Sequence, residues 1–227
     1  MANQTQRPDT ALHNTSHLMQ YHDLIESIVA AMDARDAYTA KHSDRVADMV
    51  LVLATALDLS EDETTLLHMA AHLHDIGKIA VPDSVLRKAG PLTNPEWEEM
   101  RRHPVTGYEI LRKVDDFKEI AVLVRHHHER WDGRGYPDGL RGADIPLGSR
   151  ILAVADSIDA MMSSRSYRPA MTSAACRREI ERNSGIMYDP CVAAAALEHW
   201  DELVSRYAEA DTPQTPYFDR MQLEHTR

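Results

Sequence analysis

The sequence predicts an all-α protein with a single domain, and three observations support this fold class. Apolar residues recur at helical spacing along most of the chain, as Val46, Met49 and Leu53 do between residues 39 and 57. No stretch alternates apolar and polar residues as a half-buried strand would. The 227 residues, of which 43% are hydrophobic and 27% charged, suffice for one large globular domain.

The expected helices follow from this spacing and from their start signals. Ser60 and Glu63 form a capping-box pattern, and Thr93 precedes Asn94-Pro95 as a cap before a first-turn proline. The helix that begins there should break near His103-Pro104, because a residue before proline disfavours the α conformation. The expected helices span about 18–32, 39–57, 60–75, 93–103, 116–129, 147–162, 172–183 and 190–208.

The sequence predicts that the remaining segments form a loop and two tails. Residues 131–146 hold four glycines and two prolines, which predicts an ordered loop. The chain ends are polar, so we expect a flexible N-terminal tail at 1–16, a domain at 17–208 and a C-terminal tail at 209–227.

Composition narrows the classes of function. The formal net charge of −11 argues against binding to DNA or RNA polymers, which needs a basic surface. No apolar run is long enough to cross a membrane and the N-terminus lacks a signal core, so we expect a cytoplasmic protein without a membrane contact. Cys176 and Cys191 lack metal-type spacing, and we interpret them as reduced thiols.

Several histidines fall on predicted inner faces of helices. His42 is in register with the apolar residues of 46–53, and His74 with Asp75 ends an apolar helical face. His127 and His128 lie one helical period beyond Ile120, Ala121 and Val124. For a lone histidine such as His42, the alternative of a core histidine bonded to a backbone carbonyl stays open.

Asp156 and Asp159 add carboxylates to this set. They lie three residues apart on one helix, where two carboxylates repel unless a cation lies near them. Imidazoles and carboxylates on inner faces together indicate a cation site in the core of the bundle, as helical bundles commonly build. Mixed ligands of this kind suit iron, manganese, nickel or zinc, and their number favours a binuclear site with a carboxylate bridge.

The same residues resemble a known family. His74-Asp75 followed by Gly77-Lys78 is similar to the paired signature of the HD phosphohydrolase superfamily, and His127-His128-Glu129 with the following loop resembles the HD-GYP subfamily. The GYP loop residues are Asp132, Gly133, Gly135, Tyr136 and Pro137. Further matches, over about residues 20 to 200, are Asp36 to Val46, His103-Pro104, Gly107, Ile145-Pro146, Arg150, Asp156, Asp159, Arg165 to Arg168, Gly185 and Asp189-Pro190.

The resemblance implies a helical bundle of the HD type with two buried divalent metals, iron or manganese, while zinc could bind without supporting activity. The implied metal ligands are His42, His74, Asp75, His103, His127, His128 and Asp156, with Asp75 bridging the two ions. His126 is left outside this set. Some members hold a third metal through a glutamate four residues before the first histidine, and Tyr38 stands there, so we expect two metals.

The activity implied by the resemblance is phosphodiester hydrolysis of cyclic di-GMP, a bacterial second messenger, to pGpG and onward to GMP through a metal-activated hydroxide. Asp75 and Lys78 would be catalytic. For Lys78 the alternative is an exposed lysine after a glycine turn. The implied substrate contacts are Asp36, Lys78, Asp159, Arg165 and Arg168.

The GYP loop is also implied in contact with a signalling protein, and the alternative is a structured connector packed by Trp131 and Tyr136. The first helix could serve as a homodimer contact.

Two alternative functions stay open. One is hydrolysis of another cyclic dinucleotide or a nucleotide by the same metals, and the other is a non-catalytic nucleotide-binding or signalling adaptor.

Overall fold

The computed structural model describes residues 21–35, 41–163 and 169–209, and within these ranges it contains helices and loops but no strand. The all-α prediction is thus confirmed. The predicted tail at 1–16, and 210–227 of the other tail, lie outside the described residues. The longer helices are α2 (His22–Arg35), α3 (His42–Ala56), α4 (Glu61–Leu73), α6 (Asn94–Met100), α7 (His103–Leu111), α8 (Lys118–His126), α9 (Leu147–Met162), α10 (Ser173–Arg182), α11 (Pro190–Glu198) and α12 (Trp200–Glu209).

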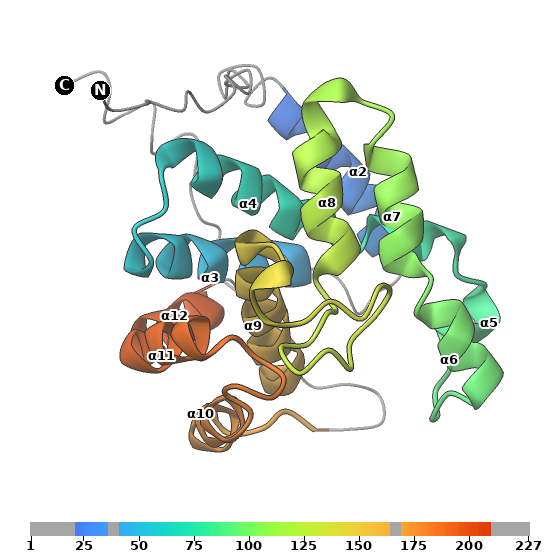
Figure 1. Cartoon of the computed structure of the whole chain (residues 1–227). Coiled ribbons are helices and arrows are strands. Elements are labelled where there is room, and N and C mark those ends of the chain that lie inside the picture. Colours follow the sequence, from blue (N-terminus) through green and yellow to red (C-terminus); the bar gives the residue numbers. More distant parts are fainter. Residues whose placement is uncertain (1–20, 36–40, 164–168, 210–227) are drawn as a thin grey trace, which may run out of the picture.

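Short helical turns join the longer helices. They are η2 (Ile76–Ala80), α5 (Asp83–Leu86), η3 (Asp115–Phe117) and η4 (Gly142–Asp144). Residues 127–141 run between α8 and η4 as a loop, seen in yellow-green in Figure 1. In the described part of the chain, no helix is both long and apolar enough to cross a membrane.

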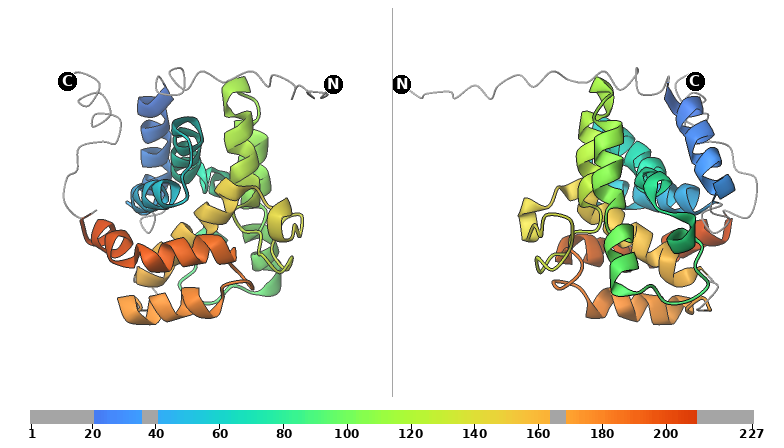
Figure 2. Two further views of the ribbon diagram at one scale, coloured as in Figure 1. Left: turned by 60° about the vertical axis from the view of Figure 1, so that its left-hand side comes forward. Right: turned by 90° about the vertical axis from the view of Figure 1, so that its right-hand side faces the viewer.

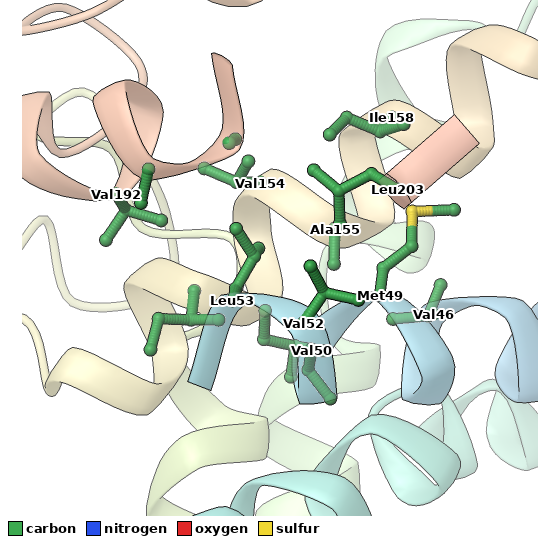
Figure 3. Packing of buried hydrophobic residues seen from close by; sticks show 14 of the residues in the cluster. Val46, Met49, Val50, Val52, Leu53, Val154, Ala155, Ile158, Val192 and Leu203 are labelled. Atoms are coloured by element: carbon green, nitrogen blue, oxygen red, sulfur yellow. The ribbon is translucent and has the colours of Figure 1, made fainter. Parts of the chain in front are cut away.

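The helices bury two apolar clusters. The first lies between α3, α9, α11 and α12, where Val50, Leu53 and Val154 are fully buried (Figure 3). The second lies between α2, α4, α7 and α8, and Figure 2 shows these helices from two further directions. Helix α4 contributes Leu67 to the first cluster and Leu73 to the second. The C-terminal end of α4, where the His74-Asp75 pair follows, is therefore fixed from both sides.

Both predicted helix starts are confirmed. Ser60 accepts from the Glu63 N–H at 3.3 Å while the Glu63 carboxylate accepts from the Ser60 N–H at 2.9 Å. Thr93 and Glu96 form the second capping box, with a proline in the first turn of α6. Each box satisfies donors that a helix N-terminus otherwise leaves unpaired.

Several predicted boundaries differ from the structure, as where the helix expected to end near residue 32 continues to Arg35, and three of the differences change the number or the ends of helices near the site or the core. The expected helix does end before His103-Pro104. A further helix, α7, begins at His103, because proline is well suited to a first helical turn. Helix α8 ends at His126, so His127 and His128 lie just beyond it. The single helix expected at 190–208 is two, α11 and α12, which meet at His199 where no glycine or proline marks the break.

Gly77 allows η2 to lie directly against α7. A Cβ atom at Gly77 would lie 1.9 Å from the carbonyl oxygen of His103 and 2.6 Å from the amide nitrogen of Gly107. Only a residue without a side chain permits this approach. The contact brings His103 to the His74-Asp75 pair, from which it is separated by more than one helix in the sequence.

Candidate metal centre

The seven predicted metal ligands converge in the structure, and most come from helix ends. His42 and His103 are the first residues of α3 and α7, while His74 and His127 follow the last residues of α4 and α8. Side chains at helix ends can aim across a bundle without disturbing the apolar face of the helix. The seven residues are His42, His74, Asp75, His103, His127, His128 and Asp156.

Six of these residues form two groups that could each hold a metal ion. We call His103, His127 and His128 the first triad, and His42, His74 and Asp156 the second triad. Within each triad, one ligand atom per residue lies within 4.8 Å of the others.

Asp75 lies between the triads and faces both. Its Oδ1 atom is 3.4 Å from Nε2 of His103 in the first triad. Its Oδ2 atom is 3.5 Å from Nε2 of His74 and 3.9 Å from Nε2 of His42 in the second triad. A carboxylate with one oxygen toward each group has the arrangement that a bridging ligand needs.

Backbone carbonyls fix the orientation of three imidazoles. Nδ1 of His74 donates to the Ala71 carbonyl at 2.7 Å, Nδ1 of His103 to Met100 at 2.8 Å, and Nδ1 of His127 to Val124 at 2.7 Å. Since a carbonyl only accepts, Nδ1 carries the proton and the lone pair of Nε2 is left for the centre. This is the outer-shell bond that metal-ligating histidines usually make.

Burial keeps these imidazoles neutral. It lowers the pKa of His74 and of His127 to about 4, and the pKa of His103 to about 3. The pKa of His128 also lies well below its usual value, mainly through burial. At neutral pH each of the four rings is therefore neutral and keeps a lone pair on one nitrogen, as metal binding requires.

His42 is held differently. Its Nδ1 lies 2.6 Å from the Asp159 carboxylate, which also accepts from Arg45 Nε at 2.5 Å. Burial alone would lower the pKa of His42, but the bond to Asp159 and the charges of Asp156, Asp159 and Asp75 raise it instead.

Asp75 itself is ionised. Burial opposes this, but Lys78, whose Nζ donates to Oδ2 at 2.5 Å, and the nearby imidazoles hold the pKa of Asp75 well below its usual range. Neutral imidazoles around ionised carboxylates are the donor set of iron, manganese and zinc sites. The residues present therefore fit a pair of divalent transition-metal ions.

The other predicted site residues divide into two groups. The Lys78 side chain is 25% exposed and lies beside Asp75, whereas Asp159 is buried behind His42 with both oxygens bonded to His42 and Arg45. Asp159 is 1% exposed, so its burial argues against a direct contact with the substrate. Asp36, Arg165 and Arg168 lie outside the described residues, as does Tyr38, on which the expectation of two metals rests.

The GYP loop is anchored to the first triad. The ring of Tyr136 lies 4.9 Å from that of His128 between centroids, at 34°. A Cβ atom at Gly135 would lie 2.3 Å from the amide nitrogen of Arg130, so the chain doubles back on itself there. Gly133, at φ +77°, has the left-handed conformation that glycine adopts readily. Asp132 and Pro137 belong to the same ordered turn.

Three residues complete the site without a role predicted for them from the sequence. Glu129 Oε1 accepts from the Asp138 and Gly139 amides at 2.7 and 3.0 Å and closes the base of the loop. Arg45 donates a hydrogen bond to the Asp159 carboxylate. The guanidinium carbon of Arg101 lies 5.6 Å from the centroid of the Tyr136 ring. Arg45 and Glu129 fall inside the motifs that carry the family resemblance, which is the signal that could have marked them. His126 bonds Val122 and Asp138 outside the centre.

Comparison with curated proteins finds relatives over most of this chain. It is 40% identical over 188 residues to 3'3'-cGAMP-specific phosphodiesterase 2 of Vibrio cholerae, covering 81% of this chain and 35% of that protein. It is 44% identical over 175 residues to the cyclic di-GMP phosphodiesterase response regulator RpfG of Xanthomonas campestris pv. campestris, covering 76% and 46%. A cyclic di-GMP phosphodiesterase of Thermotoga maritima is 38% identical over 197 residues, covering 86% and 54%. The chain thus spans between 35% and 54% of the length of these relatives.

Solved structures share the fold. A cyclic GMP-AMP specific phosphodiesterase of V. cholerae superposes with a TM-score of 0.64 at 21% identity, over 82% of this chain and 50% of that one. The HD domain of the L. monocytogenes phosphodiesterase PgpH, in complex with cyclic-di-AMP, gives 0.55 at 17% identity, over 84% and 100%. A profile of the HD domain matches residues 23–192. This match includes the His74-Asp75 pair at the middle of the site. The chain therefore belongs to the HD domain family.

Proposed function

We propose that this chain is a metal-dependent phosphodiesterase that hydrolyses cyclic di-GMP to pGpG. The observation that carries the proposal is the pair of triads that face one shared carboxylate, Asp75. Two cations held in this way suit the in-line displacement at a phosphodiester. Relatives named as cyclic di-GMP phosphodiesterases, at 44% and 38% identity, support the choice of substrate.

The proposed cofactors are two divalent ions, iron or manganese. The first triad would hold one ion, the second triad the other, and Asp75 would bridge them. When bound, the two ions supply positive charge near the phosphate and lower the pKa of water so that a nucleophile is available near neutral pH. The chain itself supplies neutral imidazoles and the ionised carboxylate of Asp75, most of them buried.

Lys78 is the proposed cationic side chain of the reaction. Its ammonium lies at the centre, beside Asp75, and its side chain is partly exposed. In the hydrolysis, water adds to phosphorus, the bond from phosphorus to O3' breaks, and a proton passes to O3'. Lys78 would stabilise the phosphoryl oxygens as they gain negative charge.

Asp159 is proposed here as a positioning residue for His42 rather than as a substrate contact. Its two oxygens already bond His42 and Arg45, and it is 1% exposed. Asp36, Arg165 and Arg168 stay proposed substrate contacts on the strength of the family resemblance alone.

The experiment that tests the function is anaerobic incubation of cyclic di-GMP with protein reconstituted with ferrous iron or manganese. The products are separated by chromatography, and a His74→Ala, Asp75→Ala double variant is the control. We expect pGpG, and GMP at longer times, from the intact chain alone. No nucleotide product from protein that holds about two ions per chain would contradict the proposal.

A second candidate substrate is 3'3'-cGAMP, favoured by the 40% identity to a phosphodiesterase specific for it. The same incubation with 3'3'-cGAMP decides between the two substrates by the ratio of their kcat/KM values.

A signalling protein bound through the GYP loop and a homodimer formed through α2 are further proposals. A Tyr136→Ala variant that loses turnover but keeps partner binding would contradict the first, and a monomer in sedimentation would contradict the second.

A further inference from the structure

We infer that Trp97 and Arg101 form a subsite that binds a purine base of the substrate and prefers guanine over adenine. The inference rests on the proposed function, because it concerns the same site and a cyclic dinucleotide as substrate. Neither residue belongs to the metal ligands or to the motifs that resemble the family.

A row of neighbouring aromatic and guanidinium side chains leads from the first triad to the surface. The Tyr136 ring lies 4.9 Å from the His128 ring, and the guanidinium carbon of Arg101 lies 5.6 Å from the centroid of Tyr136. The same guanidinium carbon lies 5.9 Å from the centroid of Trp97. Trp97 is in α6, on the side of the bundle where the GYP loop lies in Figure 1. Three successive contacts, one between two rings and two between the guanidinium and a ring, therefore connect His128, a predicted metal ligand, to the exposed Trp97.

The outer members of this row remain open to a ligand. Trp97 is 45% exposed, which is high for so large an aromatic residue, and the Arg101 side chain is 51% exposed. Tyr136, in contrast, is partly covered and its ring is fixed against His128. A base can thus stack on the exposed side of the row while the phosphodiester lies at the metal centre. Stacking of a base on an aromatic ring contributes about 1–3 kcal/mol.

The guanidinium of Arg101 supplies the selectivity. Its fork of N–H donors matches O6 and N7 of guanine, whereas adenine presents an amino donor in place of O6. Among the residues that the structure describes, the ion pair of Arg101 is with the exposed Glu98 at 3.5 Å, a long contact that leaves donors for a ligand. The positive charge of Arg101 also suits an anionic substrate on a chain whose net charge is −11.

The alternative is that Arg101 and Trp97 only stabilise the end of α6 through a surface cation–π contact. The chain provides a matched case in Arg112, which lies 5.7 Å over the ring of Tyr108 and pairs with Glu109 three residues earlier. Its side chain is also 51% exposed. Arg112 therefore has the same local chemistry as Arg101 but no link to the metal centre among the contacts described.

The test compares Trp97→Leu, Arg101→Met and the control Arg112→Met in the metal-loaded full chain. Values of kcat and KM are measured with cyclic di-GMP, 3'3'-cGAMP and cyclic di-AMP, and with bis(p-nitrophenyl) phosphate, a phosphodiester without a base. We expect Trp97→Leu and Arg101→Met to raise KM for cyclic di-GMP about 10-fold or more. This loss should exceed that on the base-free substrate at least about 10-fold, and Arg101→Met should also reduce the preference for cyclic di-GMP over cyclic di-AMP.

The outcomes separate the inference from the proposed function. An equal loss on all four substrates, or an equal effect of Arg112→Met, identifies a structural role and overturns the inference. Unchanged KM values overturn it as well, while leaving the phosphodiesterase intact. If the unmodified chain cleaves only bis(p-nitrophenyl) phosphate, the proposed substrate fails and the base subsite fails with it. Turnover of the base-free substrate also reports whether each variant is folded.

Discussion

The two triads on either side of Asp75 differ in how their histidines are held. In the first triad, whose three members are all histidines, His103 and His127 donate to the backbone carbonyls of Met100 and Val124. In the second triad, His74 donates to the Ala71 carbonyl in the same way, but His42 bonds the carboxylate of Asp159. Asp156 adds a second negative charge to that side.

This difference predicts unequal affinities for metal. Neutral imidazoles attract a cation through their lone pairs alone, whereas the second triad adds carboxylate charge and an imidazole made more basic by Asp159. We therefore expect the second triad to bind a divalent ion more tightly than the first. Asp75 faces both triads, so changes to it should not distinguish them, while changes to the residues that support one triad should.

The largest effect is expected for Asp75→Asn. It removes the negative charge that faces both triads, so both metal affinities should fall and turnover should decrease by more than the ~10–100-fold typical of losing a partner of a ligand. Metal content per chain and kcat are the measurements, with the exposed Asp201→Asn as control. If the variant keeps both ions and its turnover, Asp75 is not the shared ligand.

The next effect is expected for Asp159→Asn. The variant weakens the support of His42 and should reduce metal affinity at the second triad about 10–100-fold while the first triad changes little. Metal content is counted after dialysis against graded chelator, with Ser163→Ala as the control that removes a weaker neighbour of Asp159. Loss of both ions together would show that the triads do not bind independently.

A stability effect is expected for Gly77→Ala, which tests whether the packing of η2 on α7 positions the first triad. The new Cβ would lie 1.9 Å from the His103 carbonyl oxygen, so backbone must shift at a cost of about 1–3 kcal/mol in the free energy of unfolding. Urea denaturation measures this, and Gly90→Ala, with nothing within 4 Å of its Cβ, is the control. Equal stability of the two variants would refute the close contact.

The smallest effect is expected for Glu129→Ala at the edge of the first triad. The variant loses the acceptor of the Asp138 and Gly139 amides, so both should exchange with deuterium about 10-fold faster, the equivalent of roughly 1.4 kcal/mol. Glu129→Gln keeps an acceptor oxygen and should exchange slowly. Unchanged rates in Glu129→Ala would mean that other bonds close the loop.

Periodicity in the sequence was enough to predict the parts of the site that lie on regular helices. His42 shares the buried face of Val46 and Met49, and the range expected for α9, 147–162, matches the observed one. These features depend on residues one or two turns apart, which is the distance over which helical spacing is informative.

Contacts between distant segments were beyond this kind of prediction. His42 and Asp159 are 117 positions apart, and nothing in the local pattern of either says that they meet. His103 entered the ligand set only through the family resemblance, because the proline after it was read as the end of one helix and not as the start of α7. The approach of Arg101 to Tyr136 likewise depends on where α6 and the loop meet in three dimensions.

The most direct test of two triads sharing one carboxylate is anomalous diffraction from crystals of the manganese-loaded chain. We predict two manganese peaks, one beside His103, His127 and His128 and the other beside His42, His74 and Asp156, with an oxygen of Asp75 bound to each. A single peak in fully loaded crystals, or two peaks of which one is not bound to Asp75, would contradict the binuclear centre.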